Sequence, residues 1–113
     1  MENSEKISYE DFVKLQIKIG TILAVEVVPD ADKLLKLSVD VGEEAPRQIV
    51  SGIREYVNDP QELVGRQSPF LVNLAPRTIR GLVSDGMILA VGDEETFAFL
   101  QPHIKVASGS QVR

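Results

Sequence analysis

The stretch LQIKIGTILAVEV, residues 15–27, decides the predicted fold. Its apolar side chains recur at every second position, which is the period of a strand with one buried face. The odd-numbered residues that make up this face are Leu15, Ile17, Ile19, Thr21, Leu23, Val25 and Val27. Gly20 interrupts the run and suits a bulge or a tight bend. A long strand that curls in this way can take part in two halves of a barrel, so the stretch favours a barrel over a flat sheet.

Further strands and one short helix follow from the same kind of pattern. A turn at residues 29–32 precedes residues 35–41, where apolar and polar side chains alternate again. Strands are also expected at residues 48–53, 70–74, 87–91 and 96–100. Asp59, Pro60 and Glu62 are typical of a helix start, and Gly65 is typical of a helix end.

This order of three strands, a short helix and further strands matches the OB-fold, an all-β, five-stranded Greek-key barrel. A small β-sandwich is the structural alternative. Outside the barrel, Ser8 and Asp11 have the spacing of a capped short helix. The apolar residues of the tail beyond residue 101 are expected to add short pairings. With 113 residues, the chain is expected to form one domain, residues 1–113.

Composition excludes most familiar active sites. The chain has no cysteine and a single histidine, His103, which rules out disulfides, thiolate zinc sites and cysteine nucleophiles. Gly81, Ser84 and Gly86 are one residue off the nucleophile elbow G-x-S-x-G, which also requires a strand-to-helix turn in an α/β sheet. The acids at residues 93–95 are typical of a charged hairpin tip. No catalytic residue, cofactor or metal is therefore expected.

Hydropathy and charge constrain the partners. No apolar run approaches the ~20 residues of a membrane helix, and residues 1–6 do not form a secretion signal, so a cytoplasmic protein with no membrane partner is expected. The net charge of −5 argues against a broad electrostatic surface for nucleic acid. Positive and negative charges are nevertheless unevenly distributed along the sequence, because residues 63–84 contain no acid but include Arg66, Arg77 and Arg80. Phosphate binding is expected there.

Residues 73–87, NLAPRTIRGLVSDGM, are the most informative stretch. They resemble the signature of the tRNA-binding domain found at the carboxy end of many methionyl-tRNA synthetases, in free-standing tRNA-binding proteins and in synthetase-associated cofactors. Further blocks of resemblance follow in order and at family-like spacing at residues 18–20, 30–34, 51–53 and 62–66. The resemblance spans nearly the whole chain and is more specific than an isolated short motif.

The resemblance implies an OB-fold that binds tRNA mainly through structure rather than anticodon sequence. It also implies a homodimer whose interface is formed by residues 7–15 and by the segment from residue 101 onward. By position, the family residues linked to RNA binding correspond to Asn73, Arg77, Ser84 and Met87, with Lys33 and Arg80 as basic support. Thr78 departs from the pattern, because relatives often carry a lysine or arginine there, and this puts the affinity rather than the fold in doubt.

The same residues suit RNA by their own chemistry. The guanidinium groups of Arg77 and Arg80 stand on a loop that begins with proline, and each can bind two phosphate oxygens at once. Asn73 and Ser84 can hydrogen-bond to a ribose hydroxyl. The alternative is that Asn73 and Ser84 satisfy turn backbone while the arginines are ordinary solvated charges. Met87 is expected either to fill the barrel or to pack on a ribose or base at its rim.

Three functions are compatible with these features. The first is tRNA binding in aid of aminoacylation, either attached to a methionyl-tRNA synthetase catalytic domain, as residues 11–15 suggest, or free-standing. The second is a protein-interaction or chaperone-like module, since one branch of the family resembles a secretion chaperone. The third is a domain that chiefly dimerises a larger enzyme. Phe97 and Phe99 share a strand face and are expected to pack in the core rather than to stack on bases.

Overall fold

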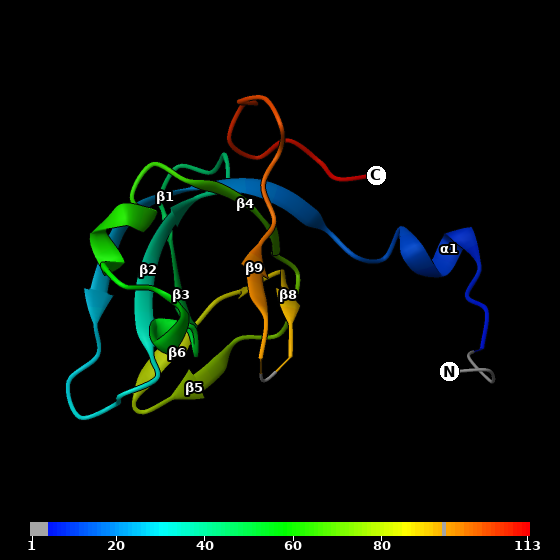
Figure 1. Cartoon of the computed structure of the whole chain (residues 1–113). Coiled ribbons are helices and arrows are strands. Elements are labelled where there is room, and N and C mark those ends of the chain that lie inside the picture. The colour runs from blue at the N-terminus through cyan, green and yellow to red at the C-terminus, as the bar shows by residue number, and fades with distance from the viewer. Residues whose placement is uncertain (1–4, 94) are drawn as a thin grey trace.

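The strand predicted from residue 15 is β1, Ile17–Val27, and it contributes to both halves of a barrel (Figure 1). The computed structural model describes residues 5–93 and 95–113. The first half of β1 pairs with β4, Gln67–Leu71, and the second half pairs with β2, Leu35–Asp40. The strand order β3-β2-β1-β4-β7 is that of a nearly closed, antiparallel, five-stranded OB-fold barrel. The predicted fold class is confirmed.

The predicted buried face of β1 is wrong over most of its length. A bulge between Ile22 and Ala24 changes the register against β2. Before the bulge the even-numbered Ile22 is buried, and after it the odd-numbered Val25 is buried, so that Leu23 is left 46% exposed. An extra residue in one strand reverses the face on which later side chains lie. The bulge does not lie at Gly20 itself. Gly20 instead allows close packing, because a Cβ atom on this residue would come within 2.6 Å of Val39 and 2.9 Å of Phe70.

The other four barrel strands are short. Their bounds, with β2 and β4 above, are β3 Arg47–Ser51 and β7 Met87–Ile88. In β2, Leu35, Leu37 and Val39 point into the core, as their alternation predicts. β4 begins three residues before the predicted start at residue 70 and includes Pro69, because its ladder with β1 extends back to Gln67.

Two hairpins extend from the barrel. The first joins β5, Arg77–Ile79, to β6, Leu82–Ser84, in a stretch that was predicted as a loop. The second joins β8, Ala90–Gly92, to β9, Phe97–Phe99. The single strand predicted at residues 87–91 is therefore wrong. It divides at Leu89, because β7 pairs with β4 whereas β8 pairs with β9.

The helices are short, as predicted. α1, Tyr9–Phe12, carries the capping box of Ser8 and Asp11. η2, Pro60–Leu63, lies between β3 and β4 and is capped by the Asp59 carboxylate, which accepts from the Gln61 amide at 3.1 Å. A second 3-10 turn, η1, spans Arg54–Tyr56. Among the described residues, no helix is long and apolar enough to span a membrane.

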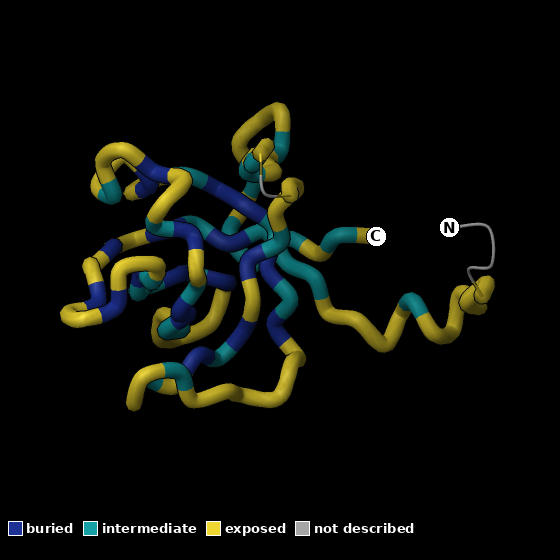
Figure 2. Tube along the Cα trace, turned by 60° about the horizontal axis from the view of Figure 1, so that its bottom comes forward, coloured by how far each residue is buried: buried dark blue, intermediate teal, exposed yellow. Residues whose placement is uncertain are grey.

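The C-terminal tail returns to the start of β1. The tail pairs with it through the bridge of Lys18 with Gln111 and through the Val112 amide, which donates to the Ile17 carbonyl at 2.8 Å. These pairings confirm the prediction for Val112, whereas the backbone of Val106 bonds to the Gln67 side chain and not to the backbone of a strand. α1 has no buried residue and stands away from the barrel (Figures 1 and 2). The core itself is aliphatic around Phe70, with Phe97 and Phe99 packed against it.

Candidate nucleic-acid interface

The β5–β6 hairpin carries two of the three arginines of the acid-free segment, Arg77 and Arg80. Ile79 pairs with Leu82, so the turn consists of Arg80 and Gly81, whose φ angles are 53° and 81°. Two successive residues with positive φ are typical of a type I′ turn, whose twist matches that of the flanking strands. Arg77 pairs with Ser84 at the base of the hairpin. The ladder thus fixes the backbone of both arginines before any ligand arrives.

Both arginine side chains are available to a ligand. Arg77 and Arg80 are exposed. Over residues 5–93 and 95–113, neither forms an ion pair with a carboxylate, whereas Arg47, Lys14 and Lys36 do. An unpaired guanidinium keeps its full set of donors for phosphate oxygens.

Lys33 lies beside Arg80 although the two are far apart in sequence. The turn between β1 and β2 and the tip of the β5–β6 hairpin enclose a hollow of about 390 Å³ that both residues line. Asp30 and Asp32 line it as well. This hollow therefore carries as many acids as bases, whereas Arg77 lies outside it.

Asn73 and Ser84 are occupied by the protein itself. The Asn73 side-chain oxygen accepts from the Gln16 amide at 2.8 Å, and its nitrogen donates to the Lys14 carbonyl at 2.7 Å. Ser84 is 5% exposed, and its hydroxyl bonds to the Val50 amide at 3.0 Å and to the Gly86 carbonyl at 3.1 Å. These contacts agree with the alternative interpretation, in which Asn73 and Ser84 satisfy backbone groups of the protein itself. A role for either residue in RNA binding stays a prediction.

Met87 lies at the rim of the barrel. It begins β7, pairs with Leu71 of β4 and is 42% exposed. Its side chain is therefore not barrel filling, and it remains available for contact with a ribose or base.

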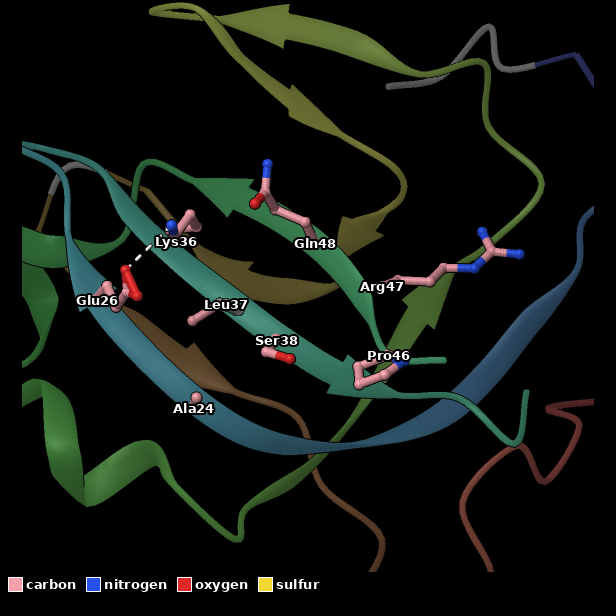
Figure 3. A pocket seen from close by; sticks show the side chains of 8 residues that line it. All are labelled: Ala24, Glu26, Lys36, Leu37, Ser38, Pro46, Arg47 and Gln48. Carbon is pink, nitrogen blue, oxygen red and sulfur yellow. Dashed lines mark ion pairs between the residues drawn. The ribbon is translucent and has the colours of Figure 1, made fainter. Parts of the chain in front are cut away.

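A second hollow, of about 310 Å³, lies over β1, β2 and β3 (Figure 3). Its cations are neutralised within the protein. Lys36 pairs with Glu26 at 3.0 Å, and the Arg47 side chain extends away from that pair and binds both carboxylate oxygens of Glu43 at 2.8 Å. These hydrogen bonds lower the pKa of Glu43 and raise the pKa of Arg47. This face offers less to phosphate than the hairpin does.

Arg47 was missed by the sequence reasoning. Its guanidinium also donates to the Val72 carbonyl and lies 3.7 Å from the Asp85 carboxylate, so it connects β3 with the segments on either side of the hairpin. The spacing of four residues between Glu43 and Arg47 is the one signal of the pair in the sequence, and on its own it is weak.

The segments predicted to form a dimer interface lie together. α1, the start of β1 and the tail enclose an open hollow of about 470 Å³. Apolar side chains form much of its wall. Three of them are well exposed, namely Tyr9 (74%), Val13 (50%) and Leu15 (42%).

Comparison with known proteins identifies what this arrangement resembles. Residues 17–111 match the family model described as "Putative tRNA binding domain". The chain is 47% identical over 111 residues to a methionine–tRNA ligase of Porphyromonas gingivalis, which covers 97% of this chain and 16% of the ligase. A methionine–tRNA ligase of Methanosarcina mazei is 45% identical over 114 residues, again with 16% of the ligase covered. The chain thus spans about a sixth of the length of these curated relatives.

Two solved structures share the fold of this chain. A methionyl-tRNA-synthetase-related protein from Pyrococcus horikoshii superposes with a TM-score of 0.89 at 33% identity, covering 97% of this chain and 100% of that chain. The chaperone CsaA from Bacillus anthracis superposes with a TM-score of 0.84 at 27% identity, covering 96% of this chain and 100% of that one.

Proposed function

We propose that this chain, which belongs to the tRNA-binding domain family, binds folded tRNA through the RNA backbone and shape, largely independently of sequence, in aid of aminoacylation. The domain performs no reaction of its own in this proposal. It binds the tRNA for a methionyl-tRNA synthetase in the cytoplasm.

The observation that carries the proposal is the pair of exposed, unpaired arginines on a preformed hairpin. Arg77 stands at the base of the hairpin and Arg80 in its turn, and both side chains are exposed. Phosphate contacts position an RNA without reading its bases, so such a surface favours a folded RNA over a particular sequence. Lys33, which lines a hollow with Arg80, and the exposed Met87 add further contacts in this proposal.

The association with a synthetase has two forms. In the ligase relatives, the matching region is 16% of a longer protein, whereas the Pyrococcus protein is covered completely by this chain. The domain acts either as the carboxy-terminal part of a methionyl-tRNA synthetase or as a free-standing partner. In both forms α1 and the tail form a homodimer interface, since apolar side chains of and beside α1 stay exposed among the residues that the structure describes.

The test is a titration of fluorescent tRNA at several salt concentrations with a double variant, Arg77→Ala with Arg80→Ala. Two lost phosphate contacts are expected to lower the slope of log affinity against log salt by about 2 and to weaken binding to unrelated tRNAs alike. Lys36→Gln is a control, because Glu26 already neutralises that charge. Failure of the wild-type chain to bind tRNA would overturn the proposal, and unchanged binding by the double variant would overturn the assignment of the contact to the hairpin.

A second function, binding of unfolded polypeptide, is favoured by one observation. The hollow of about 470 Å³ beside α1 is lined with exposed apolar side chains, and a relative of the same fold is a chaperone by name. Suppression of aggregation of a denatured client, abolished by Tyr9→Ser with Val13→Ser and insensitive to added tRNA, would favour this function over RNA binding.

A further inference from the structure

A second acid-free surface lies at the other end of the barrel from the β5–β6 hairpin. Residues 96–113 contain no Asp or Glu, as is true of residues 63–84. The fold brings parts of both segments together, because residues 65–67 and 101–105 line one hollow of about 270 Å³. Three of the lining residues are Arg66, His103 and Lys105, and no carboxylate lines the hollow. Figure 1 shows the tail loop at the top of the barrel and β5 at the bottom.

The basic side chains stand on a backbone that is fixed to the barrel. Gln67 is 8% exposed, and its side-chain amide donates to the Val106 carbonyl at 2.7 Å and accepts from the Val106 amide at 3.1 Å. The same nitrogen lies 3.1 Å from the Thr21 hydroxyl. Gln67 therefore binds the tail as a neighbouring strand would and fixes the position of Lys105, the adjacent residue.

Arg66 is held from the other side of the hollow. Its guanidinium carbon lies 5.2 Å from the centre of the Phe99 ring, and its carbonyl accepts from the Ile22 amide at 3.0 Å. A guanidinium stacked on an aromatic face keeps its edge donors free for a ligand. Because part of its rotamer freedom is already lost, binding through Arg66 costs less conformational entropy.

Charge distinguishes this hollow from the one beside the hairpin tip. Lys33 and Arg80 share their hollow with Asp30 and Asp32. Within residues 5–93 and 95–113, Arg66, His103 and Lys105 form no ion pair with a carboxylate. An imidazole can donate an N–H in either protonation state. The hollow is therefore suited to a group that carries several acceptor oxygens and negative charge, which is the chemistry of phosphate.

We propose that Arg66, His103 and Lys105 form a second phosphate-contacting surface for the bound RNA. This inference rests on the proposed tRNA binding and deepens it. The RNA contacts two ends of the barrel, because the tail loop and β5 lie on opposite sides of it (Figure 1). With contacts at both ends, the RNA is held in one orientation although the overall charge of the protein is negative. Phosphate contacts at two points orient an RNA without recognising its bases.

The test removes two charges from the hollow without removing its packing. Arg66→Met keeps an apolar stem against Phe99, and Lys105→Gln keeps a long polar side chain at an exposed position. The matched control is Lys14→Gln with Lys36→Gln, which removes the same charge from two lysines that already pair with Asp11 and Glu26. Labelled tRNA is titrated against the wild type and the two double variants over a range of salt concentrations.

The double variant of the hollow is expected to lower the salt slope by about 1 to 2 relative to the control pair. Lys105→Glu alone, a change at an exposed side chain, is expected to weaken binding further than Lys105→Gln. Circular dichroism establishes that each variant is folded.

The outcomes separate this inference from the proposed function. If the hollow variants match the control pair while the hairpin double variant loses affinity, the second surface is refuted and the tRNA-binding function stands. If the hollow variants lose affinity and the hairpin variant does not, the surface stands and the hairpin is not the contact. If the wild-type chain binds no tRNA, both are overturned.

Discussion

The Ser84 hydroxyl accepts a hydrogen bond from the backbone amide of Val50 at 3.0 Å. This contact connects β6 to β3 where the five-stranded ladder does not close, and the Asp85 amide adds a second connection to the Gln48 carbonyl at 2.8 Å. The base of the arginine-bearing hairpin is therefore part of the barrel seam. Substitutions at the base of the hairpin can therefore change both the stability of the barrel and the binding of RNA, and suitable variants separate the two effects.

Ser84→Ala is expected to destabilise the barrel by about 1–3 kcal/mol, because it leaves the buried Val50 amide without an acceptor. Urea unfolding measures this difference. Ser38→Ala, on the half-buried outer face of β2, is the control and is expected to change little. A variant that unfolds like the wild type but fails to bind tRNA would mean that the hydroxyl contacts RNA after all.

Ser68→Ala is expected to change stability in the opposite direction. The Ser68 hydroxyl is fully buried opposite Gly20, and it has no hydrogen-bond partner among the described residues. Removing an unsatisfied hydroxyl is expected to stabilise the fold by about 1 kcal/mol. Thermal unfolding of Ser68→Ala beside Ser84→Ala checks the sign, and a lower melting temperature for Ser68→Ala would contradict the expectation.

Gly81→Ala is expected to weaken tRNA binding without removing a charge. The φ angle of Gly81 is 81°, so a Cβ there costs about 1 kcal/mol and favours an open turn. An opening cost of that size lowers affinity by about fivefold. The titration is repeated with Gly52→Ala, a glycine without positive φ whose added Cβ would meet no atom closer than 3.9 Å. Equal loss in the two variants would argue against a preformed hairpin.

Stability is expected to fall slightly in acid through Glu43. Hydrogen bonds from Arg47 lower the pKa of this carboxyl in the folded state, so the stabilisation is present above its unfolded pKa and is lost as pH falls through the lower, folded pKa. The effect is small because the carboxylate is solvent-screened. Urea midpoints of wild type and Glu43→Gln are expected to differ at neutral pH and to converge below pH ~4. A constant difference would contradict the assignment.

The candidate site was predictable where it depended on local chemistry. Within the acid-free segment, Arg77 and Arg80 after Pro76 indicated an exposed basic element, and both side chains are indeed exposed. The hydrogen-bond partners of Asn73 lie 57 and 59 residues away, and Val50, one partner of Ser84, lies 34 residues away. No pattern near either residue specifies such partners, so their engagement by the protein backbone could not be read locally.

By itself the sequence determined the features that arise from neighbouring residues. The alternation of Leu35, Leu37 and Val39, the cap at Ser8 and the Asp59–Pro60 helix start all appear in the structure, because caps and strand faces depend on contacts a few residues apart. Tertiary structure alone decided which face of β1 is buried, where the run after Met87 divides, and that Arg66 and Lys105 share a hollow. Each of these depends on which distant segment supplies the partner, and that choice is made by the packing of the whole barrel.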